Sequence, residues 1–422
     1  MKTISIIAAT ISGNRGAEAM LTTTIGRIRD HYPDARFNIY SYYPDIDSKL
    51  VSDPMINIYS ATPLYLLVVL FPFSILLSLM KWTTLKLSWK WLPESVISMH
   101  DSDVLIDLAG VSFIDGREKF LPYNVLTLAP AFILDTPVIK FSQALGPFEN
   151  SLNRFFAKHT LARCLQVFAR GASTHQHLKS LSLKTLYPEP VADVAFQHRT
   201  SYRLTMENPR KLSKLTERLE QEDRKLIGIC PSSVLAVKLQ PSGNDYIEEM
   251  TSLCRRLLTE GYAVLLYPNA TREDRMAQFR NNDLPVISDI VKRLSDDGIQ
   301  PTALYFVDFD INTNSIKQLM SFCTLVMVSR FHAMIAALST NQLVIVLGWS
   351  HKYQEVMQSF NLGDFVFDFK QFDSKKIVDT IHQLLSGEQT TIRKLRQQRD
   401  LAMDSSEIQF NYLFSVLDEE PS

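Results

Sequence analysis

The sequence has few cysteines and no excess of charge of either sign. The cysteines, Cys164, Cys230, Cys254 and Cys323, lie far apart and form no C-x-x-C pair. This spacing argues against a disulfide framework or a zinc site, and it favours a reducing, cytoplasmic compartment. Lys and Arg number 44 and Asp and Glu number 45, which gives a formal net charge of -1. The chain therefore lacks the basic surplus typical of nucleic-acid-binding proteins, although a local cluster of cations can still bind a small anion.

Several catalytic signatures are also missing. The chain contains no H-E-x-x-H, G-x-S-x-G or Walker sequence, so metalloprotease, hydrolase and P-loop functions lack support. It has no long internal repeat and no low-complexity tract. The apolar run Ile4–Ile11 is followed at once by Arg15 and Glu18, which predicts a buried strand and not a signal peptide.

Short apolar runs alternate with helical patterns through most of the chain. The first half has strand patterns at 3–10, 104–108, 137–142 and 166–169, and the second half has them at 225–230, 263–267, 324–328 and 343–347. Runs rich in Val and Ile with helices between them are typical of a parallel sheet covered on both faces. The fold class predicted is α/β, with two Rossmann-like domains facing each other across a cleft.

The alternation stops once, in a polar stretch between the halves. We therefore predict an N-terminal domain at 1–200, a linker at 201–224 and a C-terminal domain at 225–422 that ends in a helical tail. In open α/β sheets, ligands bind beyond the carboxyl ends of the strands. The loops that follow the strands are therefore the places to look for chemistry.

An apolar insertion at 64–92 interrupts the first domain. Its core, 64–80, is about 17 residues long, slightly short of a bilayer span, and contains Pro72. Lys81, Trp82, Lys86, Trp89, Lys90 and Trp91 follow it, and Trp and Lys are typical of a membrane interface. Attachment to the membrane surface is the favoured interpretation, a buried helix pair is the second, and a span is the third. A span would separate the preceding strand from its own sheet.

The strongest local signal is Ser329-Arg330-Phe331-His332-Ala333, where a strand pattern ends and a helix pattern begins. Ser329 is predicted as the N-cap, with Arg330 and His332 at the first and third helical positions. Free backbone N–H groups, the helix dipole and the Arg330 fork all favour an anion, and His332 can exchange a proton near neutral pH. The alternative is a surface ion pair for Arg330 and a helix hydrogen bond for His332.

Other candidate residues also lie near strand ends. Arg170 closes the strand pattern 166–169, and with Arg330 it could hold one small anion from two sides. The turn 12–18 contains Asn14, Arg15 and Glu18, but it is not a G-x-G-x-x-G dinucleotide loop. For Asp107, Asp115, Asp193 and the pair His351-Lys352, a cap or ion pair is the more ordinary role.

These segments, in this order, resemble the polysaccharide pyruvyl transferase family. Residues 13–19 (GNRGAEA) are similar to its N-terminal G-N-x-G-D-E-A turn, and residues 143–147 (QALGP) to its Q-x-x-G-P segment. Arg170 with Ser173 resembles its R-D-x-x-S corner, 192–196 (ADVAF) its D-x-A-F end, and 329–333 its S-R-L-H-A signature. Lys352 follows where that family often has a lysine. Ala17 replaces an acidic residue, and 108–112 (LAGVS) has one glycine where the family has a glycine-rich turn.

The resemblance implies a GT-B-like enzyme that takes phosphoenolpyruvate as donor and makes a cyclic ketal on a sugar, with no metal and no cofactor. It implies donor contacts from Arg170, Arg330 and Ser329, with His332 and Arg330 as catalytic residues. Asn14, Arg15, Glu18, Asp107, Asp115 and Lys352 are candidates for acceptor or loop contacts. The acceptor would be a sugar of a cell-surface polysaccharide or of its lipid-linked precursor, and the enzyme would be cytoplasmic or peripheral at the inner face of the membrane.

Two alternatives remain open from the sequence. The first is a nucleotide-sugar glycosyltransferase of the same fold, in which the helix-corner arginine holds a diphosphate. The second is a non-catalytic, membrane-attached subunit of a glycan-assembly complex, which the changes at Ala17 and around Gly110 keep open.

Overall fold

The structure is a computed structural model that describes residues 1–82, 91–199, 209–240, 245–272, 281–298, 302–348 and 350–419. The chain forms two compact units, and each is described by itself. The first comprises Met1–Ile11, Met20–Leu204 and Ala402–Ser422. The second comprises Ser12–Ala19 and Thr205–Leu401.

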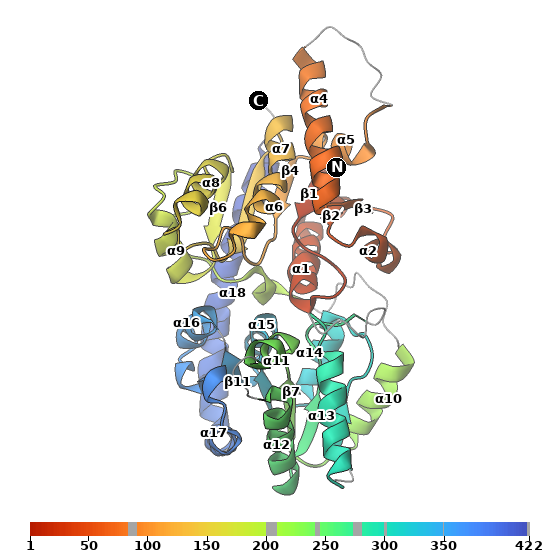
Figure 1. The fold of residues 1–422 in the computed structure, drawn as a ribbon, viewed down its shortest axis with the longest axis vertical. Helices are drawn as coiled ribbons and strands as arrows, with labels where there is room; N and C mark the ends of the chain where they lie inside the picture. Colours follow the sequence, from red (N-terminus) through yellow and green to blue (C-terminus); the bar gives the residue numbers. More distant parts are fainter. Residues whose placement is uncertain are drawn as a thin grey trace. The chain divides into compact units, whose positions relative to one another are not determined.

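The first unit is built on a parallel sheet (Figure 1). Its described strands follow the order β3-β2-β1-β4-β5-β6. They are β1 (Thr3–Ile7), β2 (Arg36–Ser41), β3 (Ile56–Ser60), β4 (Val104–Asp107), β5 (Val138–Gln143) and β6 (Gln166–Ala169). The helical elements in chain order are α1 (Arg15–His31), α2 (Pro44–Leu50), α3 (Pro63–Tyr65), η1 (Leu66–Leu70), α4 (Phe71–Trp82), α5 (Glu94–His100), η3 (Glu118–Phe120), α6 (Leu121–Leu126), α7 (Ala129–Leu134), α8 (Ser151–Leu161), α9 (Gly171–Lys179) and η4 (Val194–Gln197).

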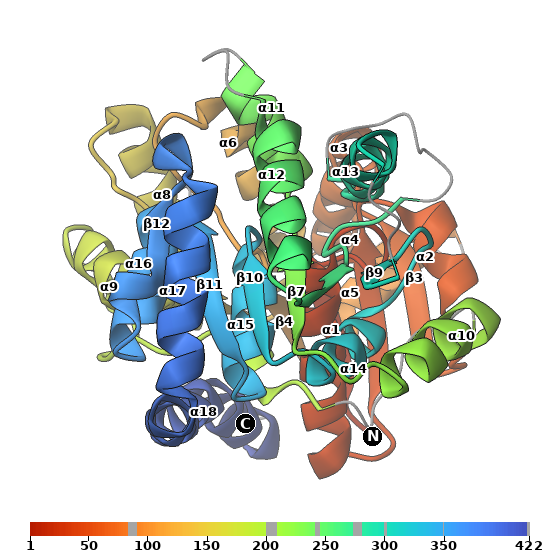
Figure 2. The same cartoon turned by 90° about the horizontal axis from the view of Figure 1, so that it is seen from below.

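The second unit repeats this plan, with described strands in the order β12-β11-β10-β7-β8-β9. They are β7 (Leu226–Cys230), β8 (Ala263–Leu266), β9 (Leu304–Phe306), β10 (Leu325–Val328), β11 (Leu343–Gly348) and β12 (Val366–Asp368). The helical elements are α10 (Pro209–Glu220), α11 (Ser233–Leu239), α12 (Tyr246–Thr259), α13 (Leu284–Asp296), α14 (Thr313–Ser321), α15 (Phe331–Ser339), α16 (His351–Ser359), η7 (Gly363–Phe365), η8 (Phe369–Gln371), α17 (Ser374–Ser386) and α18 (Glu388–Asp418). Figure 2 shows α12 and α17 in front of this sheet.

The central strands are buried along their whole length, which explains their apolar sequences. Every residue of β4, β7, β8, β10 and β11 is buried. Parallel strands covered by helices on both faces cannot alternate apolar and polar residues. The prediction of two Rossmann-like α/β domains is confirmed.

The units differ from the predicted domain bounds, and the predicted linker 201–224 contains helix α10 of the second unit. The end of the chain, Ala402–Ser422, belongs to the first unit and not to the second. There Phe410 packs edge-on against Phe141 with ring centroids 5.4 Å apart, and the Gln409 side chain accepts a hydrogen bond from the Ser142 amide at 2.6 Å. The loop and helix turn Ser12–Ala19 belongs to the second unit.

The apolar insertion forms a helix in the first unit. Within the described residues, Pro63–Lys81 is the segment long and apolar enough to cross a membrane, although 22% of its most apolar window is buried in protein. Residues 83–90, which include Lys86, Trp89 and Lys90, lie outside the described residues. The predicted membrane attachment is not tested by these observations. All four cysteines are free and buried.

Candidate functional site

Each sheet has one position where the strand order reverses. Polar and charged side chains that could bind a ligand or take part in catalysis lie at both positions. In the second unit, β7 and β10 are neighbours, and the chain leaves them toward opposite edges of the sheet. Ligands of open α/β sheets bind in the crevice at such a switch point. The loop after β7 carries Ser232 and Ser233, and the loop after β10 carries Ser329 and Arg330.

Arg330 is held in place at this switch point. Its Nε donates to Asp283 Oδ2 at 3.2 Å, and its Nη2 donates to Asp283 Oδ1 and, at 2.9 Å, to Ser233 Oγ. Among the described residues, Nη1 makes no hydrogen bond, so one edge of the guanidinium remains for a ligand. Burial alone would lower the pKa of Arg330, but the Asp283 carboxylate outweighs it and raises that pKa above its ordinary value. The group therefore stays charged at every accessible pH.

Asp283 is the centre of a hydrogen-bond cluster that the sequence did not reveal. Its side chain is fully buried and also accepts backbone N–H bonds from Ser233 at 2.9 Å, Asn269 at 3.2 Å and Ala270 at 3.0 Å. One carboxylate thus joins the loops after β7, β8 and β10. The residue precedes the Leu284-Pro285 start of α13, a pattern that predicts an N-cap, yet its side chain does not cap α13.

His332 lies in the first turn of α15 and contacts the N-terminal turn of the chain. A Cβ atom added to Gly16 would lie 2.1 Å from His332 Nδ1 and 2.3 Å from its Cγ. Only glycine permits this approach. The turn is fixed to the second unit by backbone bonds, in which Arg15 N donates to Asn269 O at 3.2 Å and Thr271 N donates to Gly13 O at 2.9 Å. The sequence placed these two motifs in different domains, whereas the structure brings them together.

Arg15 and Glu18 form a buried network behind this contact. Arg15 Nη1 donates to Glu18 at 2.7 Å, and its Nη2 donates to Asp310 at 2.8 Å and to Thr271 at 2.9 Å. The same Glu18 oxygen accepts from the Thr313 amide at 3.3 Å, at the start of α14. Burial raises the pKa of Glu18 although Arg15 acts in the opposite direction. In this structure both side chains bind protein groups. Asn14 is exposed, and its Oδ1 accepts from the Gly16 amide at 3.1 Å.

The predicted N-cap at Ser329 is wrong by one residue. Helix α15 begins at Phe331, so Arg330 occupies the N-cap position and His332 the second helical position. The Ser329 hydroxyl instead accepts a hydrogen bond from Tyr246 at 3.3 Å, because the residue is still part of the buried strand end. The Lys352 ammonium lies 4.6 Å from the centre of the Phe331 ring, one residue from His332.

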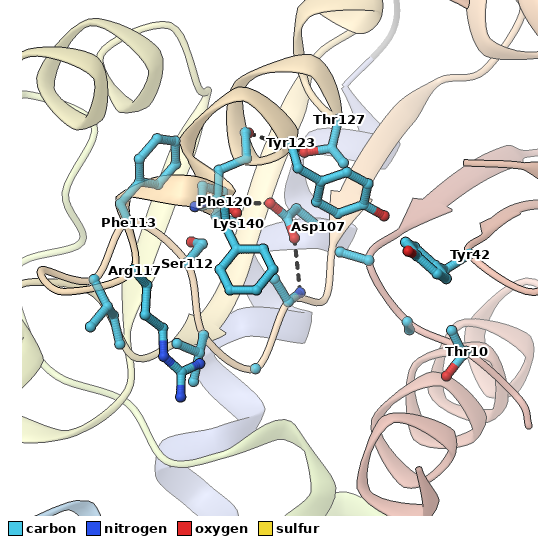
Figure 3. Close-up of a pocket in the computed structure, with 17 residues that line it drawn as sticks. Thr10, Tyr42, Asp107, Ser112, Phe113, Arg117, Phe120, Tyr123, Thr127 and Lys140 are labelled. Carbon is cyan, nitrogen blue, oxygen red and sulfur yellow. Dashed lines mark hydrogen bonds and ion pairs between the residues drawn. The ribbon is translucent and has the colours of Figure 1, made fainter. Parts of the chain in front are cut away.

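The switch point of the first unit, between β1 and β4, contains a pocket of about 280 Å³ (Figure 3). It is lined by Ala8–Thr10 after β1, by 109–114 after β4, and by the aromatic side chains of Tyr42, Phe120 and Tyr123. The Tyr42 and Tyr123 rings meet edge-on with centroids 6.0 Å apart. Aromatic faces beside polar groups suit a partly apolar ligand.

A buried ion pair contributes the charged side chains at the base of the pocket. Asp107 ends β4, Lys140 lies opposite it on β5, and the Lys140 ammonium donates to the Asp107 carboxylate. The other Asp107 oxygen accepts from the Ala109 amide at 2.8 Å. Lys140 was not among the sequence candidates, because a lysine inside an apolar strand pattern gives no signal until its partner is known. The two charges cancel, and Arg117, which also lines the pocket, leaves the lining with a net positive charge.

Arg170 and Asp193 are brought together beside that pocket. Arg170 Nη1 donates to Asp193 at 2.7 Å, and its Nη2 donates to the Gly110 carbonyl at 2.9 Å. Three of the sequence motifs thus meet at one buried guanidinium. Arg170 lies in the first unit and Arg330 in the second, so their contact with one shared anion stays a prediction.

Asp115 has a structural role in a loop. Its carboxylate accepts bonds from the amides of Glu149 at 2.7 Å and Asn150 at 3.1 Å, and from the Asn153 side chain. It is not among the residues that line the pocket. Within the described parts of the chain, no three His, Cys, Asp or Glu side chains are grouped so that they could hold a metal ion.

Comparisons with known proteins support the fold first. The UDP-GlcNAc 2-epimerase of Neisseria meningitidis, solved with UDP-GlcNAc, is 13% identical with a TM-score of 0.57, over 98% of this chain and 100% of that one. A putative UDP-N-acetylglucosamine 2-epimerase of Listeria monocytogenes is 11% identical with a TM-score of 0.58, over 98% of each chain. At such identities the likeness concerns the fold alone, which is that of GT-B proteins.

A search of the curated proteins finds no match to this chain. The family described as polysaccharide pyruvyl transferase, in contrast, matches residues 14–351. This range includes the Gly16 turn, Asp107, Arg170, Asp193 and the Arg330–His332 corner. The match covers most of the chain, and the chain therefore belongs to the polysaccharide pyruvyl transferase family.

Proposed function

We propose that this protein transfers the pyruvyl group of phosphoenolpyruvate to a sugar of a cell-surface polysaccharide or of its lipid-linked precursor. The observation that carries the proposal is the switch point of the second unit. There a partly buried, permanently charged guanidinium keeps one free edge, and an imidazole lies two residues further along the chain. Family membership supports the same reaction.

The donor carries a carboxylate and a phosphate, so it needs several hydrogen-bond donors. Arg330 Nη1 supplies one such donor, and it lies at the N-terminus of α15, where the helix dipole favours negative charge. Arg170 is the proposed second cation. Preorganised donors of this kind are worth about 3–4 kcal/mol each in the transition state.

The proposed chemistry uses His332 as the acid. The imidazolium protonates the methylene carbon of the enol, which becomes a methyl group and leaves a cation-like centre on the neighbouring carbon. One sugar hydroxyl forms a bond to that carbon and loses its proton. The carbon–oxygen bond to phosphate then breaks, and a second hydroxyl closes the cyclic ketal. Of the two hydroxyl protons, one replaces the proton that His332 gave to the methyl group, and the other leaves with phosphate.

The acceptor is proposed to bind in the pocket of the first unit. Tyr42 and Tyr123 offer ring faces for a sugar, and Asp107 offers a carboxylate edge for its hydroxyls. The charges of Asp107 and Lys140 are paired, and the remaining cation of the lining is Arg117. We place the enzyme in the cytoplasm, in keeping with its free cysteines.

Calorimetry with phosphoenolpyruvate and with a sugar nucleotide tests the assignment. The wild type should bind phosphoenolpyruvate, and Arg330→Ala should lose this binding. Arg293→Ala, which removes a half-exposed arginine of a surface ion pair, is the matched control and should bind normally. His332→Ala should bind the donor yet release no phosphate in the presence of acceptor.

Two outcomes would replace the proposal. Binding of sugar nucleotide without binding of phosphoenolpyruvate would favour a glycosyltransferase. A folded wild type without turnover on any family-appropriate acceptor would favour a non-catalytic subunit.

A further inference from the structure

The helix made by α3, η1 and α4 has two apolar faces with different surroundings. Its sequence from 54 to 80 contains no charged residue, and the segment Pro63–Lys81 has a mean hydropathy of 2.3 in its most apolar window. Such a helix normally belongs in a protein core or in lipid. Here one face is in a core and the other is exposed, so the exposed face needs an explanation.

The inner face is part of the hydrophobic core of the first unit. Leu66, Leu70 and Leu77 are fully buried there, and Ser74, also fully buried, bonds to the Leu70 carbonyl at 2.6 Å. The i, i+4 spacing of these residues forms one stripe, and α4 packs against α7. Moving the helix into the interior of a bilayer would strip this stripe from the core. The inner face therefore excludes a transmembrane arrangement of the folded unit.

The outer face presents an uninterrupted apolar surface. Six large side chains on it are between 37% and 69% exposed: Leu64, Leu67, Val68, Ile75, Leu76 and Leu79. Their spacing of three, four and seven residues places them on one side of the helix. Contiguous exposed apolar patches of this kind mark binding sites for proteins or membranes.

The residues that follow the helix favour a membrane. Between residues 81 and 93 the sequence has three lysines and three tryptophans and no acidic residue until Glu94. Trp91, the described member at the end of this run, is 82% exposed. Tryptophan prefers the headgroup level of a bilayer, and lysines near the surface are attracted to anionic lipids.

We propose that the helix Pro63–Trp82 docks the first unit on an anionic membrane surface, with its outer face among the upper acyl chains. It lies in the plane of the interface and does not span the membrane.

This docking helix adjoins the pocket of the first unit. The Tyr123 hydroxyl, from the pocket wall, donates to the Ala61 carbonyl at 3.2 Å, two residues before the helix begins. A ligand held in the pocket is therefore close to the base of the helix. If the pocket binds the acceptor, as the proposed function states, that acceptor is a saccharide anchored to lipid in the same membrane.

Vesicle sedimentation tests the docking independently of any catalysis. The full chain should bind vesicles of equal amounts of phosphatidylglycerol and phosphatidylcholine, and it should bind pure phosphatidylcholine more weakly. Leu67→Asp with Leu76→Asp should lower the partition coefficient by about tenfold or more for each substitution, because buried apolar area is replaced by like charge. The matched control is Leu152→Asp with Phe155→Asp, which adds the same charge at apolar residues of α8 that are 53% and 56% exposed. The control should bind as the wild type does.

A milder pair, Leu64→Ser with Leu79→Ser, repeats the test if the aspartates prevent folding, which circular dichroism would reveal. Three results would overturn the proposal. The first is vesicle binding by the folded outer-face variants equal to that of the control. The second is wild-type protein that forms a dimer without lipid, ignores vesicles and becomes monomeric in these variants, which would make the face an interface between copies. The third is membrane-bound protein that only detergent releases, which would mean a span.

The acceptor class is tested separately. Transfer to a saccharide on an isoprenoid lipid in vesicles should fall in the Leu67/Leu76 variant, while transfer to the same saccharide without lipid should not change. Equal loss on both acceptors would contradict the lipid anchor. Vesicle binding without transfer in any form of the protein would contradict the proposed function and leave the docking intact.

Discussion

The His332 imidazole fills the space that a side chain at Gly16 would need, because a Cβ atom added to Gly16 would lie 2.1 Å from the imidazole Nδ1. A separation under about 3 Å is far inside van der Waals contact, so one of the two residues must move if Gly16 gains a side chain. The turn around Gly16 thus packs directly against the His332 side chain. Glycine is required at position 16 because of this packing contact and not because of the backbone conformation of the turn.

Gly16→Ala should therefore move the imidazole and slow pyruvyl transfer. Overpacking costs about 1–3 kcal/mol, and we expect the melting temperature to fall accordingly while phosphate release drops by about 10² or more. Gly387→Ala, where the nearest atom to an added Cβ is 3.8 Å away, is the control and should behave as the wild type. The stability loss should shrink in a His332→Ala background. An equal loss in both backgrounds would show that the imidazole is not what the new methyl group meets.

Asp283→Asn tests the support of Arg330. The change keeps the size of the side chain but leaves the partly buried guanidinium without its counter-charge, which should cost at most about 3–5 kcal/mol of stability. If Asp283 positions Arg330 for the donor, KM for phosphoenolpyruvate should rise about tenfold with a smaller change in kcat. The matched control is Asp245→Asn, which removes the carboxylate of a surface pair with Arg293. An unchanged KM would limit Asp283 to a structural role.

Tyr42→Ala tests the pocket of the first unit. The Tyr42 side chain is 43% exposed and offers one ring face to the pocket. Its loss should weaken acceptor binding by about fivefold, in keeping with about 1 kcal/mol for an aromatic contact. KM for the acceptor should rise and KM for phosphoenolpyruvate should not. Phe155→Ala removes a ring that is 56% exposed on α8 and provides the comparison. A rise in the donor KM alone would assign the pocket to the donor.

Lys317 gives a prediction for the dependence of stability on pH. Burial lowers the pKa of its ammonium to about 8 from an ordinary value of 10.5. Between these values the unfolded chain binds a proton that the folded chain does not, so stability should rise as the pH increases from about 8 to 10.5. Lys317→Met should remove this slope and stabilise the second unit near neutral pH by about 1–3 kcal/mol. Lys375→Met, at an exposed position of α17, should leave the slope unchanged in chemical unfolding over that pH range.

The sequence predicted the short apolar strands well and missed strands that contain several polar residues. Strand β6 is found at the predicted residues, and β4 and β7 within one residue of them, because buried parallel strands are short apolar runs. Strand β2 (RFNIYS) was missed because it contains polar residues. Its Asn38 is buried, and the Asn38 side-chain amide donates to the Ser98 carbonyl at 3.2 Å. No local pattern reveals this partner, because it lies 60 residues away in the sequence.

The candidate site shows the same limit. Arg330, His332 and Arg170 were found because each follows a strand pattern directly. Asp283 and Lys140 were not found, because their importance comes from partners distant in sequence, Arg330 for the first and Asp107 for the second. The close contact of Gly16 with His332 joins motifs that are 316 residues apart (332 − 16), and only the folded chain shows it.

The single carboxylate that joins three loops has a consequence for local motion. The amides of Ser233, Asn269 and Ala270 all donate to Asp283, so no one of them can be released without disturbing the others. Their hydrogens should exchange with solvent deuterium at one common rate, as a single opening unit. The amides of Ile247 and Glu248 donate to Asp245 instead, and their hydrogens should exchange at a different rate.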